Sequence, residues 1–273
     1  TDMTDVRSLD IACREVETVI HLAAMNEIDS AANPEQALLI NGLGTLKLLQ
    51  AAERAGVKRF IYFSTAHIYG APLTGTITEK TLPRPVHPYA ITHRVAEDFV
   101  LSAHDAGNMT GIVLRLSNAF GEPATPDINR WTLIGNDLCR QAVTTGSLVL
   151  RSSGVQQRDF IPLDDVSAAV IHLLDLPADE CGDGIFNLGS GQSYSIMEFA
   201  ERVQSRCTSM LGFTPPIKRP QPDPTERAEP LNYRSDKLKA TGYAPGNGFD
   251  DEIDRTVRFC RETFGTSSLR SSK

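Results

Sequence analysis

The chain has 273 residues, 41% hydrophobic and 22% charged, which is enough to bury one large core or two modest ones. A net charge of −7 without a Lys/Arg cluster argues against nucleic acid and anionic membrane as partners. Without a long apolar run or a signal peptide, we expect a cytoplasmic protein. Five scattered cysteines without a C-x-x-C motif predict reduced thiols rather than disulfides or a metal site.

The first predicted strand is residues 18–24 (TVIHLAA), which is apolar and ends in two small residues. Asn33 and Pro34 then predict the start of a helix that runs to about Ala55, because Asn caps a helix and Pro suits its first turn. Two stripes on this helix predict contact with a sheet on one side and with a partner helix on the other. The stripes are Leu39, Leu43, Leu46, Leu49 and Ala52, and Leu38, Asn41, Thr45 and Leu48.

Residues 60–63 (FIYF) form an unbroken apolar run, as expected for a strand buried on both faces. Ser64 and Thr65 follow directly, at the carboxyl end of the strand, where ligands bind in open α/β sheets. After a Gly- and Pro-rich loop, Tyr89 and His93 begin a helical face. A hydroxyl at a strand end and a phenol on the next helix can both point at one substrate atom.

Residues 111–121 (GIVLRLSNAFG) predict a further buried strand, and a less regular segment follows over 125–153. We expect Asp164 or Asp165 to cap a helix that runs to Leu174. Residues 184–191 (GIFNLGSG) predict a last strand that ends in a glycine turn.

Ser195 to Glu198 has the pattern of a capping box, which predicts a helix from there to about Leu211. Residues 213–230 contain six prolines and are either a passive linker or a partly ordered lid. Asp250 is expected to cap a final helix, and residues 266–273 are expected to form a frayed tail. The predicted inward residues of that helix are Ile253, Val257, Cys260 and Phe264.

Taken in order, these motifs resemble the extended short-chain dehydrogenases/reductases, the family of nucleotide-sugar epimerases, dehydratases and reductases. The motifs are HLAA, Ser-Thr followed by Tyr69-Gly70, the Tyr89 helix, LRLSNAFG, RDFIPLDD and NLGSG. The resemblance implies an α/β fold with a Rossmann-like doubly wound parallel sheet and a smaller C-terminal substrate domain. Residues 1–120 and 156–192 would bind the dinucleotide, and residues 121–155 and 193–265 would bind substrate.

The resemblance implies NAD or NADP as the cofactor, but the amino-terminal part of the site departs from the family pattern. The opening TDMTD resembles the segment after the third strand, and no G-x-x-G-x-x-G turn occurs to cradle the pyrophosphate. Either the chain is truncated, so that the sheet lacks its first strands, or the cofactor site is incomplete. The implied cofactor-binding residues are Asp2, Met3, Ala23, Ala24, Asn41, Ser64, Tyr89 and His93.

For catalysis, the resemblance implies that Thr65 hydrogen-bonds the reacting oxygen and that Tyr89 exchanges its proton. His93 stands where the family has the lysine of Tyr-x-x-x-Lys, so it would replace that cation. A free tyrosine has a pKa near ~10, and an imidazole is mostly neutral above about pH 6.5, so this substitution weakens the expected base. Ala66 and His67 occupy the positions of the Asp-Glu pair of the family's dehydratases, which argues against a 4,6-dehydratase.

For substrate binding, the resemblance implies that Thr65, Asn118, Arg158 and Arg227 hold a nucleotide-diphosphate sugar. We therefore expect an NAD(P)-dependent nucleotide-sugar epimerase or 4-ketoreductase. The alternative is a catalytically degenerate scaffold that binds a nucleotide-sugar or a protein partner. The apolar helices over 34–55 and 89–106 predict a homodimer built on a four-helix bundle.

Overall fold

A parallel sheet forms the centre of the protein, as seen in a computed structural model that describes residues 1–128 and 130–265. Its strand order is β1-β2-β4-β8, and each neighbouring pair is parallel. The bounds are β1 Thr18–His21, β2 Arg59–Thr65, β4 Thr110–Leu116 and β8 Ile185–Leu188. The predicted α/β class with a parallel sheet is confirmed.

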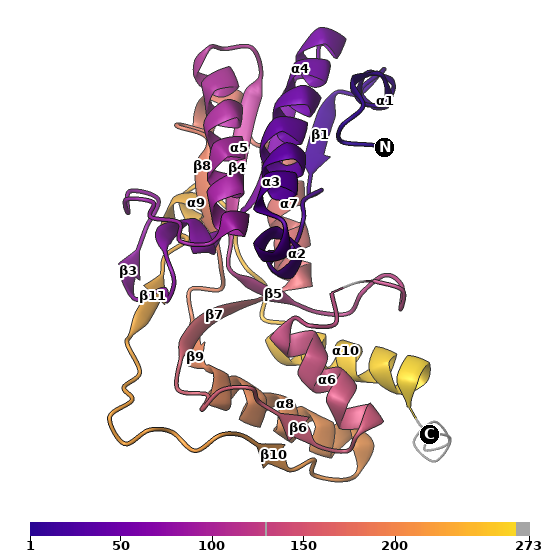
Figure 1. Cartoon of the computed structure of the whole chain (residues 1–273), viewed down its shortest axis with the longest axis vertical. Helices are drawn as coiled ribbons and strands as arrows, with labels where there is room; N and C mark the ends of the chain where they lie inside the picture. The colour runs from indigo at the N-terminus through magenta and orange to yellow at the C-terminus, as the bar shows by residue number, and fades with distance from the viewer. Residues whose placement is uncertain (129, 266–273) are drawn as a thin grey trace.

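Helices cover both faces of this sheet, which explains why its strands are continuous apolar runs. Phe60 and Tyr62 of β2 pack on one face with helices α1, α4 and α5. Ile61 of the same strand packs on the opposite face with α7. In Figure 1, α4 and α5 lie side by side over the sheet. The bounds are α1 Val6–Ala12, α2 Glu27–Ala32, α3 Pro34–Ala37, α4 Thr45–Ala55, α5 Pro88–Asp105 and α7 Leu163–Asp175.

The helix predicted over 34–55 is not a regular α-helix, because a π-helical segment, Leu38–Gly44, separates α3 from α4. A π turn inserts an extra residue and rotates the faces of the helix around it. Asn41 is therefore fully buried, whereas Leu39 and Leu43 from the predicted inner stripe are 46% and 39% exposed. Only the C-terminal part of that stripe, Leu49 and Ala52, reaches the core.

A second hydrophobic cluster lies below the sheet in Figure 1, where α6, α8 and α10 pack together. Their bounds are α6 Ile134–Thr144, α8 Ile196–Leu211 and α10 Phe249–Phe264. The capping box of Ser195 and Glu198 is confirmed at the start of α8. Ile253, Val257 and Cys260 of α10 are buried as predicted. The expected frayed tail over 266–273 lies outside the described residues.

Short strands connect the two clusters. A three-stranded sheet has the order β5-β7-β9, and two-stranded sheets pair β6 with β10 and β3 with β11. The bounds are β3 Gly75–Ile77, β5 Asn118–Phe120, β6 Leu148–Val149, β7 Gln157–Pro162, β9 Ser193–Ser195, β10 Ile217–Lys218 and β11 Leu231–Tyr233. Three short helical segments complete the list: Ala66–Tyr69, Ala178–Glu180 and α9 Asp236–Ala240.

The strand predicted over 111–121 is in fact two strands in different sheets, β4 and β5. The chain leaves the central sheet at Ser117, whose amide donates to the carbonyl of Leu188 and whose hydroxyl donates to Asp159 over 2.6 Å. These two bonds satisfy the polar groups of the bend, so Asn118 can pair with β7 instead.

Two predicted helix caps are wrong. Pro162 precedes α7 without a side-chain bond, and Asp164 and Asp165 lie in the first turn. Gly248 likewise precedes α10, with Asp250 in its first turn. A carboxylate in the first turn still interacts favourably with the positive end of the helix dipole, which is why the sequence pattern resembles a cap.

Candidate active site

A cavity of about 510 Å³ lies where the carboxyl ends of β2 and β4 meet the substrate-side elements. Five of the residues predicted from the sequence line it together: Ser64, Thr65, Tyr89, Asn118 and Arg158. They come from β2, α5, β5 and β7, which are far apart in the chain. The structure thus brings the predicted acid/base pair and the predicted anion-binding residues into one cavity.

Tyr89 and Thr65 both line the cavity, and the Thr65 side chain acts to lower the pKa of Tyr89. The His87 side chain begins α5 by accepting from the Tyr89 amide over 3.2 Å, so the phenol lies in the first turn. Burial raises the pKa of Tyr89, and the carboxylate of Glu27 raises it further; Arg130 and Thr65 act in the opposite direction. Tyr89 is therefore a protonated phenol at neutral pH.

His93 is almost completely buried, at 2% exposure. Its Nδ1 lies 2.8 Å from the carbonyl oxygen of Tyr89; a carbonyl can only accept, so Nδ1 carries the proton. Burial lowers the pKa of His93 to about 4. A neutral imidazole supplies no positive charge at neutral pH, so His93 does not reproduce the electrostatic role of a lysine there.

A second histidine, His21 of β1, is also buried near the site and was not singled out from the sequence. Its Nε2 is 2.9 Å from the hydroxyl of Thr45, and burial lowers its pKa to about 4. The Tyr62 ring lies between the two histidines, 5.4 Å from His21 and 6.0 Å from His93 between ring centroids. His21 belongs to the HLAA motif, which was the one feature of the sequence that could have pointed to it. Its burial, however, depends on packing by α4 and α5.

Asn41 connects the segment after β1 to helix α5. Its Oδ1 accepts from the Met25 amide over 2.7 Å, and its Nδ2 donates to the Thr92 hydroxyl over 2.9 Å. Because the side chain is fully buried, Asn41 supports the site from beneath rather than lining the cavity.

Arg158 presents an unsatisfied donor at the cavity. Its Nη1 donates to Asn118 Oδ1 and its Nη2 to Gln156 Oε1, each over 3.1 Å. Its Nε is buried and has no hydrogen-bond partner. A partly buried guanidinium that is held by neutral amides favours an anionic ligand, because no carboxylate of the described residues pairs with it.

Arg227 does not reach this cavity. Its guanidinium donates to the carbonyl oxygens of Pro224 and Glu226, and its side chain lines a separate cavity of about 270 Å³. A third cavity of about 390 Å³ adjoins both: Arg158 also lines the main cavity, and Gln156 also lines the cavity at Arg227. The prediction that Arg227 joins Arg158 is therefore not met by this structure.

Sequence reasoning missed three charged residues of the main cavity: Glu27, Arg130 and Arg151. Glu27 Oε2 and Arg130 Nη1 form an ion pair of 3.4 Å between α2 and the loop before α6. The two residues are about a hundred positions apart and belong to no motif, so nothing in the sequence pairs them.

The chain fits one end of a dinucleotide. Ser64 has a buried hydroxyl without a partner at the end of β2, and Ala23 and Ala24 are exposed directly after β1. Asp2 and Met3 lie outside the main cavity, Asp2 accepting from the Thr4 amide and hydroxyl. The glycine turn that cradles a pyrophosphate is not among the 273 residues.

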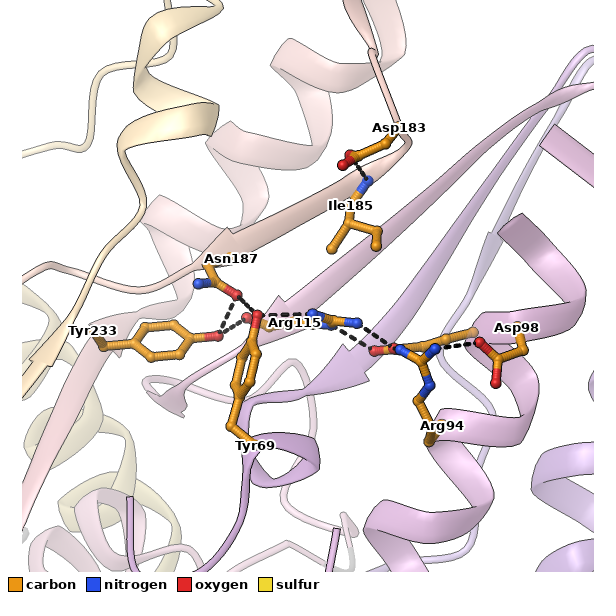
Figure 2. Close-up of polar contacts among 9 residues, drawn as sticks. Tyr69, Arg94, Asp98, Arg115, Asp183, Ile185, Asn187 and Tyr233 are labelled. Atoms are coloured by element: carbon orange, nitrogen blue, oxygen red, sulfur yellow. Dashed lines mark hydrogen bonds and ion pairs between the residues drawn. The ribbon is translucent and has the colours of Figure 1, made fainter. Parts of the chain in front are cut away.

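A buried ion pair holds α5 against the sheet. Arg115 of β4 is 1% exposed and donates to Glu97 of α5 from Nε (3.0 Å) and Nη2 (2.7 Å). Its Nη1 donates to the hydroxyl of Tyr69, which in turn donates to Asn187. Figure 2 shows these groups with Tyr233, whose hydroxyl donates to the Arg115 carbonyl. The network ties the helix that carries Tyr89 to β4, β8 and β11.

Among residues 1–128 and 130–265, no helix is both long and apolar enough to cross a membrane. The same residues contain no group of three or more His, Cys, Asp or Glu side chains arranged to hold a metal ion.

Fold and site together define a class of protein: an α/β enzyme scaffold with a tyrosine, a threonine and an anion-binding arginine at the carboxyl ends of a parallel sheet. Residues 1–189 match the model of the NAD dependent epimerase/dehydratase family, and the chain belongs to that family. The predicted resemblance to nucleotide-sugar epimerases and dehydratases is thereby confirmed, and NAD or NADP is the cofactor of the family.

Two curated relatives illustrate the similarity. The chain is 28% identical over 266 residues to a dTDP-D-glucose 4,6-dehydratase of Mus musculus, covering 92% of this chain and 69% of the relative. It is 30% identical over 219 residues to a UDP-glucose 4-epimerase of Bacillus subtilis, covering 74% of this chain and 65% of the relative.

Solved structures agree on the fold. An epimerase from Methanothermobacter thermautotrophicus superposes with a TM-score of 0.82 and 26% identity, covering all of this chain and 80% of that one. A UDP-glucose 4-epimerase from Thermotoga maritima with UDP-glucose superposes with a TM-score of 0.78 and 23% identity, covering 96% and 84%. The Rossmann-like fold is confirmed.

Proposed function

We propose that the protein is an NAD(P)-dependent nucleotide-sugar epimerase or 4-ketoreductase in which Tyr89 transfers the proton. The observation that carries this proposal is the shared cavity: Tyr89 and Thr65 line the same space as Arg158 and Asn118. One end can hold a sugar oxygen while the other holds a diphosphate. The names of the relatives, a UDP-glucose 4-epimerase among them, support this assignment.

When bound, the nicotinamide supplies hydride transfer to or from a sugar carbon. Thr65 and Tyr89 donate hydrogen bonds to the oxygen on that carbon, and Tyr89 gives or takes its proton. Asn118 and Arg158 hold the diphosphate, which orients the sugar. Because the pKa of Tyr89 is raised, the phenol is protonated at neutral pH. It therefore holds the proton that reduction of a keto sugar needs, whereas oxidation of an alcohol needs the scarcely populated tyrosinate.

We propose a positioning role for His93. Its bond to the Tyr89 carbonyl and the 4.1 Å between the two ring centroids fix the first turn of α5. The exposed Ala23 and Ala24, together with Ser64, lie on the side proposed for the cofactor.

A second candidate function is a scaffold that binds a nucleotide-sugar or a protein without turnover. The neutral His93 in the lysine position favours it, because Tyr89 then has no cation one turn further along its helix. The buried, unpartnered Nε of Arg158 is compatible with both candidates.

Replacing Tyr89 by Phe separates the two candidates. In the first, Tyr89→Phe abolishes turnover of UDP- or dTDP-4-keto sugars with NAD(P)H and leaves nucleotide-sugar affinity nearly unchanged. Turnover is followed by nicotinamide absorbance and affinity by calorimetry. Wild-type protein that binds nucleotide-sugar but never oxidises or reduces nicotinamide would be the scaffold. Tyr194→Phe, outside the cavity, is the control.

The assembly we propose is a homodimer built on the π-helical segment and α5. Leu38, Leu39, Leu43 and Ile91 are large apolar side chains that this arrangement leaves exposed. A second copy would bury them in a four-helix bundle. Leu39→Glu should convert a dimer into a monomer in sedimentation, and a wild-type monomer at every concentration would contradict the proposal.

We also propose a cytoplasmic location. All five cysteines are free and buried in the structure, which suits a reducing compartment.

A further inference from the structure

The main cavity is lined by more positive than negative side chains. The described residues that line it include one carboxylate and three arginines: Glu27, Arg130, Arg151 and Arg158. Glu27 Oε2 and Arg130 Nη1 pair with each other at 3.4 Å. Arg151 and Arg158 remain as two cations that no carboxylate of the described residues neutralises.

Arg151 is the less constrained of these two cations. Arg158 donates to the side chains of Asn118 and Gln156, whereas no described residue forms a hydrogen bond or an ion pair with the side chain of Arg151. Arg151 is exposed, yet it lines the same cavity as Arg158. Because no polar contact with the described residues has to be broken, its whole charge is available to a ligand there.

The loop that carries Arg151 is held in place, although the side chain is free. This loop, residues 150–156, connects β6 to β7. The amides of the first two residues of α8 donate to the carbonyls of Gln156 and Gly154 over 3.0 and 2.9 Å. The buried Ser153 donates from its hydroxyl to Glu226 over 2.7 Å. Arg151 is therefore presented to the cavity from a fixed backbone.

Gln156 connects this loop to Arg158. Its Oε1 accepts from Arg158 Nη2 over 3.1 Å, and its backbone carbonyl accepts from the amide of Ile196, which also lines the cavity. Arg151 and Arg158 thus belong to one wall, made by the loop 150–156, β7 and the start of α8. Tyr89 and Thr65 come from other elements, α5 and β2.

A pair of unneutralised arginines on one wall suits a diphosphate. The diphosphate of a nucleotide-sugar carries a negative charge on each phosphate, and a guanidinium can bind phosphate oxygens through two N–H groups. The sequence resemblance implied a second substrate arginine, but Arg227 lies at a separate cavity. We propose that Arg151 is the second arginine that holds the diphosphate, beside Arg158. This inference rests on the proposed function, because it takes a nucleotide-sugar as the ligand.

Calorimetry of UDP and dTDP with the full chain tests the role of Arg151. Arg151→Gln should weaken the affinity for the nucleotide that the wild type binds by about tenfold or more, since a charge-assisted contact is lost. The difference from the wild type should shrink as NaCl is added, because salt screens an exposed charge. Arg151→Lys keeps the charge and should lose less affinity than Arg151→Gln.

Lys218→Gln is the matched control. It removes one positive charge from an exposed residue of β10, outside the main cavity, and should leave the affinity unchanged. Urea unfolding of Arg151→Gln should match that of the wild type, which separates lost binding from a folding defect. Equal affinities in Arg151→Gln and the wild type, or a loss that is the same at every salt concentration, would overturn the inference and leave the proposed function standing. Wild-type protein that binds neither nucleotide would instead remove the proposed function itself.

Discussion

At the scale of single residues, we propose that the position of His93 limits how well Tyr89 can act as a base. The neutral, buried imidazole is fixed to the Tyr89 carbonyl and leaves the phenol with a raised pKa. Oxidation of a sugar alcohol needs the tyrosinate, so activity in that direction should be low near neutrality and rise in alkali.

His93→Lys should raise this oxidative activity and move its rise to lower pH, because an ammonium beside Tyr89 stabilises the phenolate. The measurement is a pH profile of turnover at saturating dinucleotide, together with the tyrosinate absorbance of the same proteins. His93→Gln keeps a donor for the Tyr89 carbonyl without a charge and should show no such shift. If His93→Lys binds cofactor and substrate yet stays inert at every pH, the missing lysine is not the defect.

Arg158 is expected to act on substrate rather than on the fold. Arg158→Ala should weaken nucleoside diphosphate binding by roughly 2–3 kcal/mol, since a charge-assisted contact is lost. Calorimetry with UDP and dTDP measures the loss. Arg227→Ala is the matched control and should change the affinity less, because Arg227 lies in a separate cavity. Equal losses in the two variants would show that Arg227 moves to the diphosphate on binding.

At the scale of elements, the buried pair of Glu97 and Arg115 fixes α5 on β4. Glu97→Ala leaves the Arg115 charge uncompensated in the interior and should lower the free energy of unfolding by roughly 3–5 kcal/mol. Replacing both residues, Glu97→Leu with Arg115→Met, should recover part of that loss because no lone charge remains. Urea unfolding measures both.

The exposed ion pair of Arg54 and Asp10 is the control for this prediction. Arg54→Met should cost no more than about 1 kcal/mol, as is usual for an exposed pair. Similar losses at the buried and exposed pairs would contradict the role assigned to Glu97.

At the scale of the whole molecule, two buried histidines make the fold sensitive to acid. The pKa values of His21 and His93 are about 4 in the folded protein, against an ordinary value near 6.5. Between these values the unfolded chain binds more protons, so stability is complete above about pH 6.5 and falls as the pH drops toward about 4. Each shift corresponds to roughly 3 kcal/mol at most.

Urea unfolding at a series of pH values checks this prediction. His21→Gln and His93→Gln retain a donor without a titrating group and should each flatten the loss of stability in that window. Burial raises the pKa of Asp159, so protonation of this carboxyl in acid favours the folded state and opposes the effect of the histidines. The wild-type stability profile is therefore compared with the profiles of the two variants rather than with a calculated curve. Identical acid sensitivity in wild type and both variants would show that these histidines do not control it.

The sequence by itself located the strands of the central sheet and five of the cavity residues, because both depend on local order. Residues 60–63 are apolar throughout, so they predict a strand covered on both faces, and Ser64 and Thr65 must follow at its end. The resemblance implied that Thr65 and Asn118 share the substrate site, and the carboxyl ends of the parallel strands β2 and β4 lead to both residues. The four-residue spacing from Tyr89 to His93 likewise placed both rings on one face of α5.

Only the tertiary structure decided the electrostatics of the site. The neutrality of His93 comes from the burial of its face of α5, and the largest effect of a charge on the pKa of Tyr89 comes from Glu27, which pairs with a residue about a hundred positions away. The π turn in the predicted 34–55 helix and the distance of Arg227 from the cavity are also set by packing. The burial of a side chain and the charges around it depend on residues that are distant in the chain. The spacing of residues along the sequence therefore does not predict them.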